Sequence, residues 1–382
     1  MSITTSQTIQ RLKEQGAVYE HLGIRPIING NGTQTTLGGS IMDPETAQAM
    51  HDASRTMVVI EELNQKAGEI IAEHTGAESG IVTAGAAAAL LVQAAAVIAG
   101  LDPERIFRLP DTTEMPNEIV IKRSHHSEFT QSWREAGAEL VWVGGDDDEI
   151  EAGISEQTVA LGFIASRWNP DSFEGLDSMI RIAHRYSLPV LVDAAAMLPP
   201  AENLRRFIDH GADLVVYSGG KAIRGPQSTG ILCGRQELVV AAAANNSPNH
   251  AIGRPAKVAR EEIVGLVVAL ERYVQRDHEA EMQTWHDQAQ IIADTVSTAS
   301  GVKAMIVQDD WVRPVPEVSI SFTSQFSGRT AHQIVEDLAK GDPAIIIEAS
   351  RRADEDIFVN PINLMPGEEE LLAQRLLAAM VR

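Results

Sequence analysis

The sequence predicts an α/β protein with a mostly parallel sheet covered by helices, followed by a smaller α+β region. Three observations indicate this architecture. Short apolar runs alternate with helical stretches through the middle of the chain, as in parallel sheets whose two faces are both covered. A long helical stretch then precedes a region in which strands and helices mix. The 382 residues suffice for one large and one smaller domain.

The N-terminal part is predicted to be a helix and an irregular arm. Residues 1–22 have the pattern of an amphipathic helix, and the glycine-rich stretch that follows cannot be regular helix or strand throughout. From Pro44 the pattern becomes helical, and a second helical stretch ends at Gly76, as helix C-termini often do.

Six strands are expected in the sheet of the large domain. They occupy residues 118–123, 138–144, 159–166, 189–195, 213–218 and 230–234. Helices are expected between them at residues 127–137, 175–187 and 202–211.

The long helical stretch begins near Lys257 and leads into the C-terminal region. Strands are expected there within 315–322 and 344–350, with a last helix from Gly367. We therefore divide the chain into an N-terminal helix and arm (1–45), a large cofactor-binding domain (46–256) and a small C-terminal domain (257–382).

Composition and charge exclude several classes of function. A formal net charge of −22 disfavours binding to nucleic acid or to anionic membranes, because both need a basic surface. The longest apolar run, from Ala86 to Gly100, is shorter than the roughly 20 residues of a membrane span. Cys233 is the only cysteine, so no internal disulfide forms, and the first residues lack an apolar signal core. We expect a cytoplasmic protein that acts on a small molecule.

Two strand ends carry the residues that pyridoxal 5'-phosphate (PLP) needs. Ligands of open α/β sheets bind at the carboxyl ends of the strands, where Asp193 and then Lys221 occur. PLP requires a lysine for its Schiff base and a carboxylate that keeps its pyridine nitrogen protonated. Taken singly, Asp193 also fits a helix cap or a salt bridge, and Lys221 also fits a surface lysine.

Other residues complete this interpretation. A turn at Gly85 and Ala86 leads directly into an alanine-rich helix, whose free N–H groups suit a phosphate, and the hydroxyl of Ser218 can add to the same site. His125 and His126 follow a strand, where one of them can lie flat on the pyridine ring. Adjacent histidines on a strand point to opposite faces, so no metal site is expected.

Four stretches resemble one family in the same order along the chain. GADLVVYSGGKAIRGPQSTGILCG resembles the lysine segment of the selenocysteine synthase-like group, which is related to L-seryl-tRNA(Sec) selenium transferase, within the fold-type I PLP-dependent enzymes. PIINGNGT, GIVTAGAAAALL and GDPAIII resemble that group's N-terminal arm, phosphate turn and C-terminal motif. The chain looks most similar to the D-glucosaminate-6-phosphate ammonia-lyase type.

This resemblance implies roles for the residues already singled out. It implies Lys221 as the lysine that binds PLP and Asp193 as the partner of the pyridine nitrogen. It places Gly85, Ala86 and Ser218 around the phosphate and His125 or His126 against the ring. In this fold the loop that here carries Gln227 and Ser228 approaches the cofactor of a neighbouring subunit, so a homodimer or an assembly of dimers is implied.

The chain also departs from the group. Gly220 stands where the group usually has aspartate, which, with the acidic charge, argues against a tRNA substrate. Glu348 stands where an arginine for the substrate carboxylate is expected. The arginines that can take this role instead are Arg167, Arg313, Arg351 and Arg352.

The expected reaction is α,β-elimination of a β-hydroxy or sugar amino acid to a 2-oxo acid and ammonia, which makes the chain a PLP-dependent lyase. The alternatives are an amino acid racemase or epimerase, and then an aminotransferase or an aldolase. All of these use the same lysine and aspartate, and a fold alone does not choose between them. A binding protein without catalysis is the remaining alternative.

Overall fold

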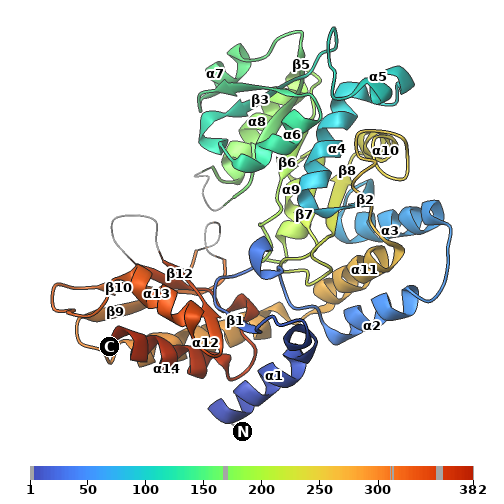
Figure 1. The fold of residues 1–382 in the computed structure, drawn as a ribbon. Coiled ribbons are helices and arrows are strands. Elements are labelled where there is room, and N and C mark those ends of the chain that lie inside the picture. The colour runs from blue at the N-terminus through green and yellow to red at the C-terminus, as the bar shows by residue number, and fades with distance from the viewer. Residues whose placement is uncertain (1–3, 167–170, 310, 312–313, 350–355, 382) are drawn as a thin grey trace. The chain divides into compact units, whose positions relative to one another are not determined.

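A computed structural model of the chain describes residues 4–166, 171–309, 311, 314–349 and 356–381. The chain forms two compact units, each with its own core. One comprises residues 40–276, and the other comprises residues 1–39 together with 277–382. We describe them in turn (Figure 1).

The larger unit is built on a seven-stranded sheet with the strand order β2-β8-β7-β6-β5-β3-β4. In the run β7-β6-β5-β3-β4 each strand is parallel to the next, whereas β8 is antiparallel to both β2 and β7. The strands are β2 (Ser79–Thr83), β3 (Glu118–Lys122), β4 (Glu139–Val143), β5 (Thr158–Ile164), β6 (Val190–Asp193), β7 (Leu214–Ser218) and β8 (Gly230–Gly234).

Helices flank this sheet. One group, around α4, packs on β7 and β8, and a second group packs on the sheet through α3, α7, α8 and α9. The helices are α2 (Pro44–Ala53), α3 (Ile60–Thr75), α4 (Gly85–Ala99), α5 (Pro103–Arg108), α6 (Gln131–Glu135), α7 (Asp147–Ala152), α8 (Phe173–Arg185), α9 (Asn203–Asp209), α10 (Gln236–Ala244) and α11 (Arg260–Gln275).

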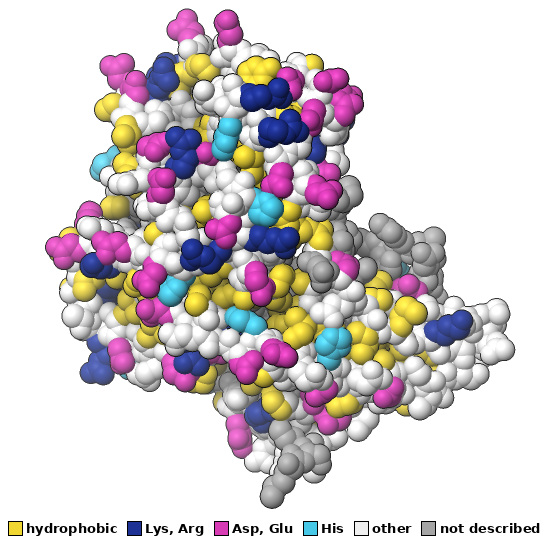
Figure 2. All heavy atoms as spheres, turned by 180° about the vertical axis from the view of Figure 1, so that it is seen from behind, with side chains coloured by type: hydrophobic (Ala, Val, Ile, Leu, Met, Phe, Trp, Pro, Cys, Tyr) yellow, Lys and Arg dark blue, Asp and Glu magenta, His cyan; other side chains and the backbone are white. Residues whose placement is uncertain are grey.

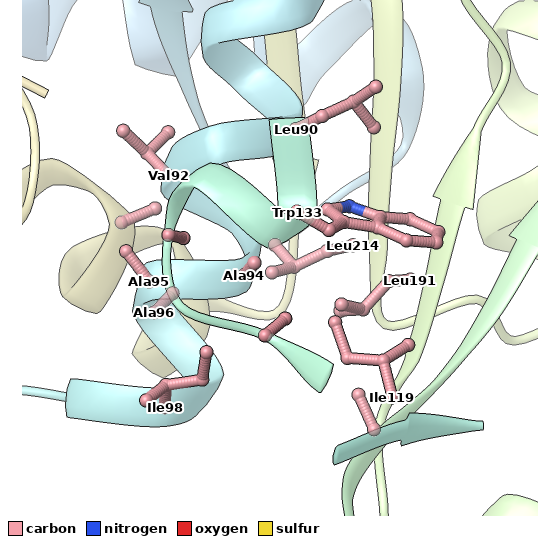
Figure 3. Packing of buried hydrophobic residues seen from close by; sticks show 14 of the residues in the cluster. Leu90, Val92, Ala94, Ala95, Ala96, Ile98, Ile119, Trp133, Leu191 and Leu214 are labelled. Atoms are coloured by element: carbon pink, nitrogen blue, oxygen red, sulfur yellow. The ribbon is translucent and has the colours of Figure 1, made fainter. Parts of the chain in front are cut away.

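The core of this unit lies between α4 and the sheet (Figure 3). The small side chains of the alanine-rich helix α4 let it sit close to the strands, and Trp133 from α6 fills the space beside it. Gly162 of β5 makes room for that indole, because a Cβ there would lie 2.7 Å from the Trp133 ring. The buried Gln93 accepts a hydrogen bond from the Trp133 Nε1 and donates one to the carbonyl of Leu214, which ties α4 to β7.

The smaller unit combines helices with two small sheets. A four-stranded sheet has the order β12-β13-β10-β9, and β1 pairs with β11. Its elements are α1 (Thr5–His21), β1 (Ile27–Asn29), α12 (His278–Val296), β9 (Val302–Val307), β10 (Glu317–Phe322), α13 (Ala331–Lys340), β11 (Ala344–Ile346), β12 (Glu348–Ala349), β13 (Ile357–Val359) and α14 (Glu368–Met380).

The predicted fold class is confirmed, and all six predicted strands of the large sheet are present. Two features differ from the expectation. The strand β2 was missed, because its short run leads straight into α4 and resembles a turn. The sheet is also mixed, since β8 runs against its neighbours.

The compact units also differ from the three predicted segments. Helix α11 lies in the larger unit, where Gly265 faces Met50 of α2 and Pro226, so the division falls after Arg276 rather than after residue 256. The arm up to Gly39 lies in the smaller unit, where the side-chain amide of Asn363 donates to the carbonyl oxygens of Gly32 and Gly39.

Acidic side chains are spread over the face seen in Figure 2, with lysines and arginines between them. Among the helices that the structure describes, none combines the length and the apolar character needed to cross a membrane.

Candidate active site

The candidate site lies at the carboxyl ends of the parallel strands of the larger unit. Asp193 is the last residue of β6, and Ser218 is the last residue of the neighbouring strand β7. The register pairs Asp193 with Val216, and Lys221 follows β7 after a Gly-Gly turn. The sheet therefore brings together the two residues that the sequence predicts to bind PLP.

Asp193 and Lys221 form an electrostatically coupled pair. Burial raises the pKa of the Asp193 carboxyl, against a hydrogen bond from the Ala195 N–H at 3.0 Å and the positive charge of Lys221. Burial lowers the pKa of the Lys221 amine, against the negative charge of Asp193. No carboxylate among the described residues forms a salt bridge with Lys221, so its amine remains available for chemistry.

Tight backbone packing holds the turn that carries Lys221. The N–H of Gly219 donates to the Thr229 carbonyl at 2.9 Å, and the N–H of Gly225 donates to the Gly219 carbonyl at 2.8 Å. A Cβ at Gly220 would lie 2.4 Å from the Cα of Gln227, so the loop leaves no room for a side chain there. Gly220 is thus required by the close approach of Gln227 in this loop.

The first turn of α4 is open to an anion. No side chain caps this helix and its first turn contains no acidic residue, while Gly85 has a φ of 75° that favours glycine. Gly230 packs beneath the turn, where a Cβ would lie 2.5 Å from the Gly85 carbonyl carbon and 2.8 Å from the Ala86 nitrogen.

Ser218 lies beside this turn through strand pairing. Gly230 is the register partner of both Thr83, which precedes the turn, and Ser218. The half-buried Ser218 hydroxyl has no hydrogen-bond partner among the described residues. The first turn of α4, Ser218 and the intervening Gly230 are therefore the candidate site for a phosphate group, which helix N-termini and hydroxyl groups favour.

The two histidines that follow β3 have different environments. His125 is buried, its Nε2 lies 2.9 Å from Asp171 Oδ2, and its Nδ1 accepts a hydrogen bond from the Ile164 N–H at 3.2 Å. Burial lowers the pKa of His125 to about 4, against the nearby Asp171 carboxylate. His126 is exposed, and its ring lies over Trp142 with 5.5 Å between centroids. His125 is thus bound to the end of β5, and His126 faces away from it towards β4.

The remaining predicted residues have no described contact with Asp193, Lys221 or the first turn of α4. Gln227 and Ser228 are exposed, and the Ser228 hydroxyl donates to Glu262 Oε1 at 2.6 Å. The candidate arginines Arg167, Arg313, Arg351 and Arg352 lie outside the described residues.

Sequence reasoning missed three residues of the site. Gly230 was assigned only to a strand, and its contact with the phosphate turn depends on the pairing of β8 with β2. Lys122 and Asp171 form a salt bridge of 2.7 Å beside His125. Lys122 adjoins the histidines in sequence, but no local pattern indicates that Asp171 contacts them.

Comparison with known proteins identifies the family. The model of the family "Aminotransferase class-V" matches residues 49–252, which is more than half of the chain and includes most of the candidate site. The chain belongs to this family. Its fold-type I architecture and its PLP cofactor follow from this membership.

Three relatives narrow the position of this aminotransferase class-V protein within the family. A 5'-C-glycyluridine monooxygenase-decarboxylase from a Streptomyces species is 33% identical over 94% of this chain and 90% of its own length. A D-glucosaminate-6-phosphate ammonia lyase from Salmonella typhimurium is 32% identical over 94% of this chain and 96% of its own length. An L-seryl-tRNA(Sec) selenium transferase from Moorella thermoacetica is 23% identical over 94% of this chain and 82% of its own length.

A solved structure agrees with these relatives. The structure of a D-glucosaminate-6-phosphate ammonia-lyase superposes with a TM-score of 0.82 at 31% identity, covering 95% of this chain and 98% of that one. The resemblance predicted from the lysine segment, to the selenocysteine synthase-like group and its ammonia-lyase type, is thereby confirmed.

The site fits PLP on its own geometry. Asp193 is only 5% exposed and its carboxylate has a single hydrogen bond from the described residues, which leaves one oxygen for a ring N–H. The open turn of α4 fits the phosphate, and Lys221 supplies a desolvated amine between these two groups in the strand order.

Proposed function

We propose that the chain catalyses α,β-elimination of a β-hydroxy or sugar amino acid, releasing a 2-oxo acid and ammonia. The observation that carries this proposal is the desolvated Lys221 amine beside the buried Asp193, in a chain 32% identical to an ammonia lyase over nearly its whole length. In the balanced reaction, Cα loses its proton and Cβ loses its hydroxyl as water, which forms a Cα=Cβ double bond. The resulting enamine tautomerises to an imine, which takes up water and releases ammonia and the 2-oxo acid, so the net change is loss of ammonia.

Each residue has a proposed task in this reaction. PLP, when bound, supplies an electron sink for the electrons left on the substrate Cα. Lys221 binds the cofactor and then takes the proton from Cα, for which a lowered amine pKa is an advantage. Asp193 keeps the proton on the ring nitrogen, while the first turn of α4 and Ser218 hold the phosphate.

The proposal extends to the assembly and the location of the protein. Gln227 and Ser228 are exposed on the loop after Lys221, which supports a homodimer, or an assembly of dimers, in which this loop meets a neighbouring subunit's cofactor. A cytoplasmic location is supported by Cys233, the only cysteine, which is buried and cannot form an internal disulfide.

A second candidate is an oxygen-dependent decarboxylation of an amino acid attached to a nucleoside. It is favoured by the 33% identity with the 5'-C-glycyluridine monooxygenase-decarboxylase over 94% of the chain. Both candidates begin with the breaking of a bond to the substrate Cα, and both use the same lysine and aspartate. They differ in which bond breaks, the bond to hydrogen or the bond to the carboxyl group, and in the need for oxygen.

A substrate panel separates these reactions. The PLP-loaded protein is incubated with D- and L-β-hydroxy amino acids, sugar amino acids and a glycyl nucleoside, with and without oxygen. We expect equal amounts of 2-oxo acid and ammonia, independent of oxygen. Oxygen uptake with release of carbon dioxide would instead establish the second candidate.

The same panel addresses the remaining alternatives. Inverted amino acid without ammonia would mean a racemase, and 2-oxo acid formed only with an amino acceptor would mean an aminotransferase. An aldehyde product released together with a smaller amino acid would mean an aldolase.

A further inference from the structure

An ion pair between a buried lysine, Lys122, and a half-buried aspartate, Asp171, lies beside His125, outside the groups that the proposed reaction uses. Lys122 Nζ donates to Asp171 Oδ2 at 2.7 Å, and the side chain of Lys122 is 5% exposed. His125 Nε2 lies 2.9 Å from the same carboxylate oxygen and its side chain is fully buried. Burying a lysine and a carboxylate costs free energy that pairing only partly offsets, so such a pair is weak evidence for a role in stability alone.

The hydrogen bonds fix the position of the proton on His125. The Ile164 N–H can only donate, so Nδ1 must accept and carries no proton. In the neutral ring the proton is therefore on Nε2, which donates to Asp171 Oδ2. Both ring nitrogens are bonded to protein partners, and the ring also packs against Phe163 in a T-shaped contact, with 4.6 Å between centroids and 87° between the ring planes.

The ring is attached next to the residue that binds the pyridine nitrogen. Ile164 is the last residue of β5, and its register partner in β6 is Asp193. With both nitrogens bonded to the protein, His125 has only the faces of its ring left for contact with a bound cofactor.

We propose that Asp171, held by Lys122, is a positioning residue that fixes His125 as the neutral Nε2–H tautomer, so that His125 offers a flat face rather than a proton. The inference rests on the proposed function only in placing the cofactor against His125. Asp171 and Lys122 act only through His125 and do not contact the substrate.

The charged groups around His125 come from three elements. They are Lys122 at the end of β3, Asp171 before α8 and Asp193 on β6, which lies next to β5. Protonation of Nδ1 would break the bond from Ile164 and place a cation next to Lys122. His125 is thus expected to stay neutral from pH 8 down to about 5, consistent with its lowered pKa.

The first test reads the tautomer directly. Nitrogen NMR of ¹⁵N-histidine-labelled full-length protein, with PLP and after its removal, should assign to His125 an unprotonated Nδ1 and a protonated Nε2 that do not titrate in this range. A protonated Nδ1, or titration near neutral pH, would overturn the proposal.

The second test separates positioning from stability. In the double variant Lys122→Met with Asp171→Leu, apolar side chains replace both partners of the ion pair, so no unpaired charge remains and the melting temperature should stay near that of the wild type. His125 loses its acceptor, so its NMR signals should split or broaden, and PLP affinity should fall about tenfold, with a fall in kcat and little change in KM. Asp171→Asn retains an acceptor oxygen and should keep the wild-type His125 signals and most of the affinity.

A matched control exists in the same unit. His184 Nε2 lies 2.9 Å from Asp213 Oδ2, and Arg235 is the cation of this group, 3.1 Å from Asp213 Oδ1. Asp213 directly precedes β7, so this group lies at the amino ends of the strands, whereas Lys122, Asp171 and His125 lie at the carboxyl ends. Asp213→Asn should lower the melting temperature and leave PLP affinity and the His125 signals unchanged.

The outcomes distinguish this inference from the proposed function. A double variant with wild-type His125 signals and wild-type PLP affinity would overturn the positioning role. Equal losses of PLP affinity in Asp171→Asn and in the double variant would also overturn it. Such losses would mean that the charge of Asp171 matters, rather than its hydrogen bond with His125. If the wild type formed no 2-oxo acid, the proposed function would fail, while the tautomer and PLP affinity would still decide the role of Asp171.

Discussion

Asp193 is buried and Lys221 is half-buried, and each favours the charged form of the other. Asp193 ends β6, and Lys221 follows the neighbouring strand β7. Burial alone would neutralise both groups, so keeping them charged costs free energy in the PLP-free protein. A ligand with a protonated ring nitrogen and an aldehyde gives each of them a partner.

Removal of the Lys221 amine should abolish cofactor attachment. In Lys221→Ala we expect no visible absorption band that borohydride converts into a covalent lysine adduct, and kcat lower by about 10³-fold or more. Lys66→Ala, at a side chain that is 73% exposed, is the control and should behave like the wild type. A Lys221→Ala protein with the normal band and rate would disprove the assignment of this lysine.

The same pair should lower the stability of the PLP-free chain near neutral pH. Asp193 has a raised folded-state pKa, so its stabilising contribution is present at acid pH and is lost as pH rises through that value. Lys221 has a lowered pKa, so its contribution is present above its ordinary value and is lost as pH falls through the folded value. Asp193 therefore contributes less above its ordinary pKa of 3.8 and Lys221 contributes less below its ordinary pKa of 10.5, and neutral pH lies between these two values.

A double variant tests this balance. Asp193→Asn with Lys221→Met should raise the free energy of unfolding of the PLP-free protein at neutral pH by about 1 kcal/mol or more, measured by urea unfolding. Added PLP should stabilise the wild type and not the variant. A variant that is less stable than the PLP-free wild type would show that the pair is favourable without its ligand.

Much of this site was predictable because strand ends are local features of the sequence. The position of Asp193 after an apolar strand and the Ser-Gly-Gly-Lys turn both survive in the structure as predicted neighbours. The contacts of Gly230 and Asp171 were not predictable in this way. They depend on an antiparallel strand pairing and on the contact of Asp171 with Lys122, which lies 49 residues earlier in the chain, and neither leaves a local pattern.

Gly230 should be required for the phosphate end of the site. Alanine at this position would place a Cβ 2.5 Å from the Gly85 carbonyl carbon and push the first turn of α4 away from the sheet. We expect Gly230→Ala to weaken PLP binding by roughly tenfold or more, measured by titration of the PLP-free protein with the cofactor. Gly145→Ala, where a Cβ meets nothing within 4 Å, is the control. Unchanged PLP affinity in Gly230→Ala would place the phosphate elsewhere.

Gly220 should not accept the aspartate that the sequence resemblance leads us to expect at this position. The Cβ of any side chain would lie 2.4 Å from the Gln227 Cα, so Gly220→Asp should destabilise the protein by about 1–3 kcal/mol, measured by urea unfolding. The control is again Gly145→Ala. A Gly220→Asp protein as stable as the wild type would mean that the loop readily moves away from Gly220 to make room for a side chain.

His125 should make the protein sensitive to acid. Burial lowers its pKa from 6.5 to about 4, so its contribution to stability is present above pH 6.5 and is lost as pH falls towards 4. Gln has no such titration, so His125→Gln should lose up to about 3 kcal/mol less stability than the wild type between pH 7 and pH 4, measured by urea unfolding. His126→Gln removes the exposed neighbour and should keep the wild-type acid dependence. Equal acid dependence in all three proteins would mean that His125 does not stay neutral, and the fixed tautomer would then fail with it.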